Sequence, residues 1–334
     1  MPVIVFRGLE GWCDRLQVLS HCFKYCKKFN TALCVDWDDQ VWGGGEFDFN
    51  TCFEIVDIKT MTKQQVLRMV QSGRMDIRPK CWTPKKMAQH LHTETYGNDY
   101  IGEFMKYDVD VKCPGDVLVT NGRGERTWDV REVVRHLRFK PAVLKGIQER
   151  LKDFDPNSVV VHLRGTDRPD SKGNYMEKSI EALKKLPYPI FVITDQRDLW
   201  ETFHAEMPHA KLVNPASNIL RIPPTNDHGT HQMSPADLKK HGITKWDMML
   251  DLMTDWVALV TARMACGREE STYFHMARSI NKLTDNMWKE MFGGWMPRSK
   301  SLEEYNETLL LSHREQEEVQ QGVGLAVSEA QDVC

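Results

Sequence analysis

The sequence predicts an α/β protein of two Rossmann-like domains, each with a parallel sheet. The chain has 334 residues, more than the roughly 250–300 residues at which a single hydrophobic core stops growing. Strand-like apolar runs alternate with helical patterns, as in βαβ units. This alternation starts again near residue 139, after a less regular stretch. We therefore expect an N-terminal domain over 1–138, a C-terminal domain over 139–300, and a helix and tail over 301–334.

The N-terminal domain opens with the pattern strand, glycine turn, helix, strand. Residues 3–7 are an apolar run followed by Gly8 and Gly11, and residues 32–37 form a second such run. Between them, apolar side chains recur at three- and four-residue spacing, which predicts a helix over 15–26. Later in this domain we expect a loop at 42–45, helices at 61–72, 83–92 and 130–137, and a strand at 116–120.

The C-terminal domain repeats the alternation with clearer strands. Strands are predicted at 158–164, 189–194, 211–213 and 258–261. Helices are predicted at 141–154, 175–186, 197–206, 245–256 and 272–280. Residues 214–242 carry Pro, Asn, His and Gly without periodicity, which is typical of a long loop.

The overall composition is typical of a globular protein and argues against nucleic acid as its main partner. Hydrophobic residues make up 41% of the chain and charged residues 27%, with a net charge of -3, whereas proteins that bind phosphate backbones are usually basic. The N-terminus lacks the basic and long apolar regions of a signal peptide. The apolar run at 248–260 is interrupted by Asp251 and Asp255 and is too short to span a bilayer. We expect a soluble cytoplasmic protein without an anchor.

The cysteines predict reduced thiols. There are nine of them, an odd number, and none forms a Cys-x-x-Cys pair. Several stand in apolar runs, which indicates buried thiols in a cytosol-like compartment and not a disulfide framework.

The strongest candidate for a functional site follows the strand at 158–164. Four apolar residues place this strand in the centre of a sheet, and His162, Arg164, Asp167 and Arg168 come at its carboxyl end. In open α/β sheets ligands bind outside that end of the strands. Arginine is suited to phosphate oxygens, and a preplaced cation stabilises the charge that develops on a leaving diphosphate.

A second candidate is the turn after the first strand, with Gly8, Gly11, Asp14 and Arg15. Glycines let a backbone approach a ligand, and the start of the following helix favours anions. A tight turn between strand and helix explains the two glycines equally well.

A third candidate runs from Asp251 to the segment that contains Glu270, Ser271 and Thr272. Ser271 is placed to cap the helix predicted at 272–280. A helix that starts at the carboxyl end of a strand also suits a phosphate, so capping and binding both remain open.

Two short patterns resemble metal sites. Asp36-Trp37-Asp38 matches the Asp-x-Asp pattern that holds a divalent cation in some transferases, but it directly follows a strand, where a surface strand end is the plainer interpretation. His228 and His231 lie in a loop without a third ligand nearby, which is weak evidence for zinc. We therefore expect no metal and no cofactor.

Taken in order, the motifs resemble those of the fucosyltransferase group that includes α1,6-fucosyltransferases, protein O-fucosyltransferases and the rhizobial nodulation fucosyltransferase. The segment 159–167 resembles their His-x-Arg motif, and 191–195 is similar to the strand that follows it. Residues 246–251 resemble their helix with an aspartate that holds guanine, and 270–272 fall near their serine-rich loop. The turn from Gly8 to Arg15 is similar to their glycine-rich first turn.

This resemblance implies a GT-B fold, a GDP-sugar donor, inversion at the anomeric carbon and no required metal. It implies that Arg164 stabilises the leaving diphosphate and His162 orients the donor, with Asp167 or Asp170 as general base. It also implies a donor-binding set consisting of Gly8, Gly11, Asp14, Arg15, Asp195, Asp251, Glu270, Ser271 and Thr272. The sequence departs from the group at Gly165, where an arginine is common, and at Lys172, where some members have a glutamate.

The sequence therefore predicts transfer of a sugar, fucose from GDP-fucose in the first instance, to a hydroxyl of an oligosaccharide or glycoconjugate. Another GDP-sugar donor, a metal-dependent transferase that uses Asp36 and Asp38, and a non-catalytic nucleotide- or glycan-binding protein are the alternatives. A nucleic-acid-modifying transferase is disfavoured by the net charge. The acceptor, the linkage and the oligomeric state are not encoded in any motif.

Overall fold

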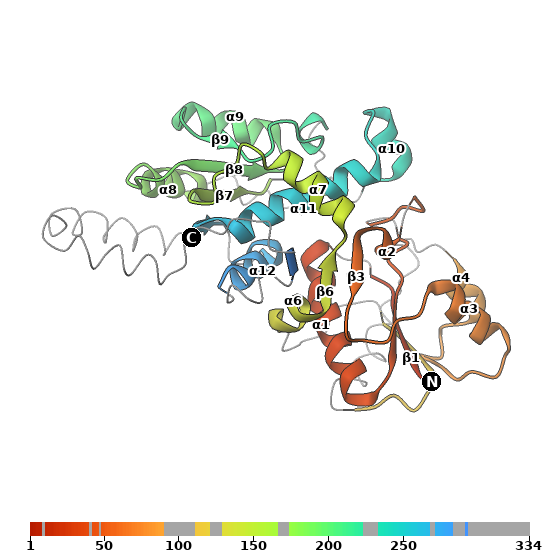
Figure 1. Ribbon diagram of the computed structural model, residues 1–334. Coiled ribbons are helices and arrows are strands. Elements are labelled where there is room, and N and C mark those ends of the chain that lie inside the picture. Colours follow the sequence, from red (N-terminus) through yellow and green to blue (C-terminus); the bar gives the residue numbers. More distant parts are fainter. Residues whose placement is uncertain are drawn as a thin grey trace, which may run out of the picture. The chain divides into compact units, whose positions relative to one another are not determined.

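The computed structural model describes residues 1–8, 11–39, 42–46, 48–89, 111–120, 129–165, 174–222, 233–267, 271–282 and 291–292 (Figure 1). The chain divides into two compact units. Unit 1 consists of Met1–Leu144, His231–Trp246 and Glu290–Phe292, and unit 2 consists of Lys145–Thr230, Asp247–Lys289 and Gly293–Cys334. The predicted boundary after residue 138 makes each domain one continuous stretch, whereas in the structure His231–Trp246 packs with unit 1.

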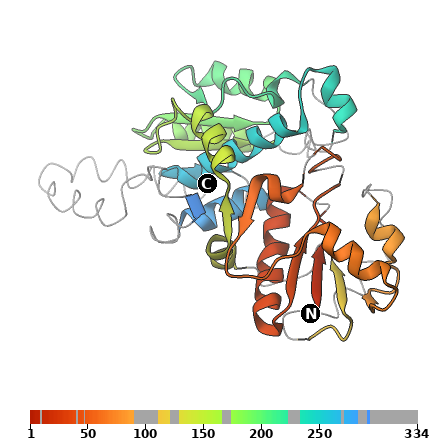
Figure 2. The same ribbon diagram turned by 45° about the vertical axis from the view of Figure 1, so that its right-hand side comes forward.

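Unit 1 is built on a four-stranded parallel sheet in the order β2-β1-β5-β4. Its strands are β1 (Val3–Phe6), β2 (Ala32–Val35), β4 (Ile77–Arg78) and β5 (Val117–Thr120). Alternate residues of these strands face opposite sides, so Val3 and Val5 join the core under the helices α3 (Lys63–Gln71) and α4 (Pro84–Ala88). Figure 2 shows α1 (Trp12–Phe29) on the other side of this sheet.

Local sequence sets the ends of the unit 1 helices. Gly11 precedes α1 in an extended conformation, and Asn30 ends it in the left-handed region with φ 49°, a conformation that asparagine tolerates. Thr62 and Gln65 form a reciprocal capping box at the start of α3, which satisfies backbone N–H groups that the helix itself leaves unpaired. Among the described residues, unit 1 also contains α2 (Phe49–Cys52), β3 (Phe53–Ile55), α6 (Val130–His136), β6 (Leu137–Phe139) and α10 (Pro235–Lys240).

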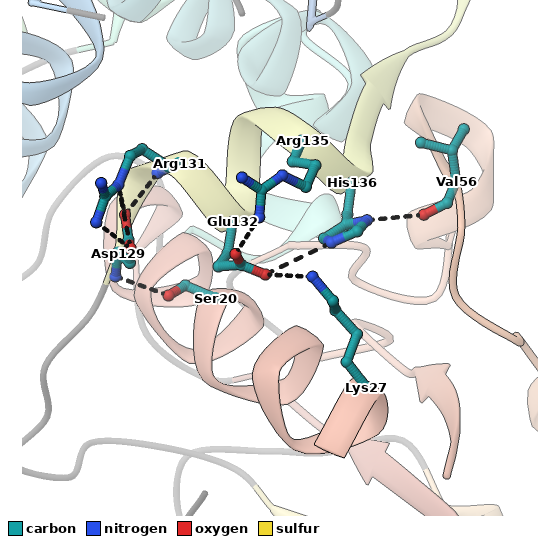
Figure 3. A network of polar contacts seen from close by, with 8 residues as sticks. All are labelled: Ser20, Lys27, Val56, Asp129, Arg131, Glu132, Arg135 and His136. Atoms are coloured by element: carbon teal, nitrogen blue, oxygen red, sulfur yellow. Dashed lines mark hydrogen bonds and ion pairs between the residues drawn. The ribbon is translucent and has the colours of Figure 1, made fainter. Parts of the chain in front are cut away.

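A polar network fixes α6 against α1 and against the end of β3 (Figure 3). Glu132 accepts from Arg135 at 2.6 Å and lies 3.5 Å from Lys27 of α1. His136 Nδ1 lies 3.1 Å from the carbonyl of Val56, and because a carbonyl only accepts, Nδ1 carries the proton. β6, which directly follows α6, pairs antiparallel with β3. The network therefore helps to hold β6 in place beside β3.

Unit 2 contains a second four-stranded parallel sheet, in the order β10-β7-β8-β9. Its strands are β7 (Val159–Leu163), β8 (Ile190–Thr194), β9 (Lys211–Leu212) and β10 (Met264–Cys266). The helices α8 (Asn174–Leu183) and α9 (Arg197–Glu206) cover one face, and α7 (Pro141–Arg150) and α11 (Lys245–Thr261) lie on the other (Figures 1 and 2). α12 (Thr272–Asn281) follows β10.

Most predicted elements are confirmed, and the errors have identifiable causes. Residues 258–261, predicted as a strand, are the last turn of α11, and the strand beside β7 is β10 at Met264–Cys266. A short continuous apolar run does not distinguish a buried helix turn from a buried strand. The loop predicted at 214–242 contains the 3-10 turn η3 (Ile219–Arg221) and α10. The helix predicted at 83–92 is only five residues long in the described chain, as α4.

Among the cysteines that the structure describes, all but one follow the prediction. Cys13, Cys22, Cys26, Cys34, Cys52, Cys81 and Cys113 are free, and all but Cys81 are buried. Burial raises the pKa of the Cys26, Cys34 and Cys52 thiols to about 12, so these thiols are not reactive thiolates at neutral pH. Cys266 is disulfide-bonded, so the expectation of reduced thiols throughout the chain is wrong for this residue. No helix in the described ranges combines the length and the apolar character that crossing a membrane requires.

Candidate active site

The topology of unit 2 points to the carboxyl ends of β7 and β10. The chain proceeds from β7 to β8 and β9 on one side and then returns to place β10 on the opposite side of β7. Such a reversal of strand order is where open parallel sheets bind their ligands, because the loops diverge there and leave a crevice. The segments that leave this point begin at Arg164 and at Gly267.

The alternation of β7 places His162 and Arg164 on one face of the sheet. Val159, Val161 and Leu163 point into the core beneath α8 and α9, so His162, and Arg164 just beyond the end of the strand, face the opposite side. Both side chains are half-buried. The imidazole of His162 packs against the ring of Tyr273, with the ring centroids 5.3 Å apart.

His162 is held in its neutral form. Burial, and then the positive charge of Arg164, lower the pKa of His162 from 6.5 to about 3. A neutral imidazole donates one hydrogen bond and accepts another. With this pKa it is a poor proton acceptor, so the geometry fits His162 as a group that orients a polar ligand and not as a general base.

Gly165 is where the chain turns out of β7, and the side chains of Gln196 and Leu199 pack closely against it. A Cβ at this position would lie 2.5 Å from Gln196 Oε1 and 2.5 Å from Leu199 Cδ1. The amide of Gly165 donates to Asp195 Oδ1 at 2.9 Å. A side chain at Gly165 would require the ends of the Gln196 and Leu199 side chains to move, and Asp195 holds the turn in place.

α12 begins beside β7. The hydroxyl of Ser271 accepts from the amide of Phe274, so the predicted cap is confirmed. Thr272, half-buried, is the first residue of the helix. Tyr273 donates its hydroxyl to the carbonyl of Leu252 at 2.7 Å, which ties α12 to α11. The start of α12 thus lies beside His162 of β7, near the strand end that Arg164 follows.

Asp251 is fully buried, and four donors of the chain occupy its carboxylate. Oδ1 accepts from Arg150 Nε at 2.8 Å and from Asn214 Nδ2 at 3.0 Å. Oδ2 accepts from the amide of Asn218 at 2.7 Å and from Asn218 Nδ2 at 3.1 Å. The carboxylate therefore binds the segment after β9, and these bonds occupy the oxygens that a nucleotide base would need as acceptors.

The predicted donor-binding residues of the first turn belong to unit 1, where they serve its core. Arg15 forms two hydrogen bonds of 2.8 Å with Asp39, and its side chain is 1% exposed. A Cβ on Gly8 would lie 2.6 Å from the Arg15 guanidinium, so the packing of Arg15 accounts for this glycine. Gly11 is the residue before α1, and Asp14 is half-buried in its first turn.

The Asp-x-Asp carboxylates are paired with cations of the chain. Asp36 binds Arg7 at 2.9 Å and Lys63 at 3.1 Å, and Asp38 lies 3.4 Å from the same lysine. Burial raises the pKa of Asp36. Within the described ranges, no group of three or more His, Cys, Asp or Glu is placed to hold a metal ion.

Several predicted residues lie outside the described residues. They are Asp167, Asp170, Arg168, Lys172, Glu270, His228 and His231. Sequence reasoning also missed Tyr273, Asp39 and Lys245. None of these three belongs to a motif, and each is defined by contacts with residues distant in the sequence.

Comparison with known proteins supports the fold. No family model matches the sequence, and no curated protein matches it. Among solved structures, the chain is similar to NodZ α1,6-fucosyltransferase co-crystallised with GDP, with a TM-score of 0.58 and 15% identity over 83% of this chain and 92% of that chain. The fucosyltransferase NodZ from Bradyrhizobium gives a TM-score of 0.57 and 16% identity over 83% and 93%. The GT-B fold and the resemblance to the fucosyltransferase group are thereby confirmed at the level of architecture.

Proposed function

We propose that the protein is a glycosyltransferase that moves fucose from GDP-fucose to a hydroxyl of a glycan acceptor, with inversion and without a metal. The observation that carries the proposal is the placement of His162 and Arg164 at the switch point of the unit 2 sheet. A fold shared with NodZ structures, one of which was co-crystallised with GDP and another soaked with GDP-fucose, supports the choice of donor.

The chemistry follows from the charges at this strand end. The acceptor oxygen forms a bond to the anomeric carbon of the donor while the bond from that carbon to the phosphate oxygen breaks and GDP leaves. Arg164 then stabilises the negative charge that builds up on the diphosphate, and the start of α12 favours the same charge. Neutral His162 donates a hydrogen bond to donor oxygen. The acceptor proton passes to a carboxylate, for which the motif nominates Asp167 or Asp170.

Nucleotide binding tests the donor class. Titrations of the whole chain with GDP, UDP, CDP, dTDP and ADP, each with and without EDTA, are expected to show selective binding of GDP that EDTA does not change. A ligand at 100 times its dissociation constant raises the free energy of unfolding by about 2.7 kcal/mol, enough to raise the melting temperature measurably. Selective binding of UDP instead would discard the GDP-sugar donor. If binding requires a divalent ion, the alternative of a metal-dependent transferase that uses Asp36 and Asp38 is favoured.

Transfer from labelled GDP-fucose to a glycan panel tests the role of Arg164. We expect Arg164→Ala to lower kcat/KM by about 10²–10³-fold, as removal of one preplaced donor does at other sites of developing charge. Arg263→Ala is the matched control. Arg263 precedes the amino end of β10, whereas Arg164 follows the carboxyl end of β7, and the Arg263 guanidinium lies 4.5 Å from the centroid of the Tyr188 ring. Equal activity of both variants would reject the assignment. GDP binding by the wild type without any transfer or hydrolysis would favour a non-catalytic binding protein.

A further inference from the structure

The environment of Asp251 points to a role other than direct contact with a nucleotide base. An ionised carboxylate offers about four lone-pair sites. Arg150, Asn214 and Asn218 fill these sites with four hydrogen bonds of 2.7 to 3.1 Å. A guanine edge that approached Asp251 would have to displace one of these bonds inside a fully buried site, at the cost of leaving that donor unpaired.

These bonds determine the shape of the turn that follows β9. Asn214 and Asn218 are the first and last residues of this turn, and the amide of Ser217 donates to the Asn214 carbonyl at 3.0 Å. The turn runs into η3, whose Leu220 carbonyl accepts from Arg197 Nε of α9. Asp251 thus gathers both ends of a five-residue turn from the neighbouring helix α11.

This turn lies at the carboxyl ends of the strands, the side of a parallel sheet where ligands bind. β9 is parallel to β8 and β7, so the residues after β9 leave the sheet at the same edge as Arg164. Within the turn, Ser217 is 5% exposed, and its hydroxyl oxygen has no hydrogen-bond partner among the residues that the structure describes. A buried hydroxyl left unpaired is unfavourable, so it is suited to a partner supplied by a ligand.

We propose that Asp251 is a positioning residue: it fixes the 214–218 turn, and this turn, through the Ser217 hydroxyl, contacts the base of the donor nucleotide. The inference rests on the proposed function and deepens it, because it assigns base selection to the turn and not to the aspartate. Arg150 of α7 binds the same carboxylate at 2.8 Å, so Asp251 joins this helix to the two asparagines of the turn.

The test compares variants that either remove the carboxylate or leave it in place. Calorimetric titration with GDP and with UDP is made for the wild-type chain and for Asp251→Asn, Asn218→Ala and Ser217→Ala. Asn218→Ala and Ser217→Ala keep Asp251. We expect each of them to weaken GDP binding about tenfold and to reduce the preference for GDP over UDP, as Asp251→Asn does. A purely structural role of the turn would not change that preference.

Asp255→Asn serves as the matched control for the loss of a carboxyl group on α11. Asp255 lies one turn after Asp251, and burial, together with the charge of Asp251, holds its pKa well above the usual range, so the neutral amide resembles the state already present. We expect Asp255→Asn to bind GDP as the wild type does. In urea unfolding, Asp251→Asn is expected to be the less stable of the two.

Two results would overturn the inference. If Asp251→Asn loses GDP while Asn218→Ala and Ser217→Ala bind it as tightly as the wild type, the carboxylate itself contacts the base. If all three variants bind GDP normally, the turn has no role in recognition although the proposed donor stands. A wild-type chain that binds no GDP is the separate outcome that removes the proposed function, and the assignment of base contact with it.

Discussion

Replacing Arg15 by methionine is expected to be strongly destabilising. Arg15 and Asp39 are 1% and 0% exposed and share two hydrogen bonds of 2.8 Å. The guanidinium also lies over the rings of Trp37 and Trp42, at 5.1 and 5.8 Å from their centroids. Methionine fills part of the space but leaves the Asp39 carboxylate buried without its main partner.

The magnitude follows from the burial of that pair. Removing one member of a buried ion pair costs about 3–5 kcal/mol, because the remaining charge is uncompensated. The amide of Trp42 still donates to Asp39 at 3.1 Å, and Lys245 lies close enough to Asp39 for an electrostatic interaction, so we expect the lower half of this range. Proteins of this kind are stable by about 5–15 kcal/mol, which makes the loss a large fraction of the total.

The matched control is Arg131→Met. Arg131 also donates two hydrogen bonds to one carboxylate, that of Asp129, at 2.9 and 2.8 Å (Figure 3), but its side chain is 63% exposed. Exposed pairs contribute about 0–1 kcal/mol. The two variants therefore each remove an arginine that is hydrogen-bonded twice to a carboxylate, and they differ strongly in burial.

Urea unfolding followed by tryptophan fluorescence and circular dichroism measures both variants. Where two transitions are resolved, the change is expected in only one of them, since Arg15 belongs to unit 1. The double variant Arg15→Met with Asp39→Asn should lose less than the sum of the single losses, because it leaves no buried charge unpaired. A loss below about 1 kcal/mol for Arg15→Met with an unchanged m-value, or one equal to that of Arg131→Met, would refute the reasoning.

Three further predictions concern individual positions. Gly8→Ala should destabilise unit 1 by about 1–3 kcal/mol, because the new Cβ would lie 2.6 Å from a guanidinium that Asp39 holds in place; urea midpoints equal to those of the wild type would contradict this. Burial lowers the pKa of Lys245 from 10.5 to about 7, so the folded state holds fewer protons than the unfolded state between these values, and stability relative to Lys245→Met should be lost as the pH falls toward 7, by up to about 1.4 kcal/mol per pH unit. If the free energy of unfolding depends on pH in the same way for the wild type and Lys245→Met, the lowered pKa of Lys245 is excluded. The pKa of Asp255 is raised, so its effect on stability runs in the opposite direction with pH. Its favourable contribution is complete below pH 3.8 and is lost as the pH rises through the folded-state pKa. Asp255→Asn should therefore be more stable than the wild type at pH 7 and should lose this advantage in acid, which thermal unfolding at the two pH values measures.

The sequence by itself determined the fold class, most elements and the strand that carries the candidate site. These features are local or periodic. The spacing of Leu16, Leu19 and Phe23 defines α1, and the apolar run before His162 and Arg164 defines a central strand, at whose carboxyl end open α/β sheets bind ligands. The resemblance to fucosyltransferases followed from the same short segments, and the structural likeness to NodZ confirms it for the fold.

The tertiary structure alone decided what the individual side chains do. Arg15, expected at a donor, binds Asp39, which is 24 residues away, and Asp251, expected at a base, accepts from residues 33 to 101 positions away. A Cβ at Gly165, where an arginine is common in the fucosyltransferase group, would meet the side chains of Gln196 and Leu199. Periodicity shows which face of an element is buried, but not which partner meets a buried charge. That choice depends on contacts between distant segments, and only the folded chain brings those segments together.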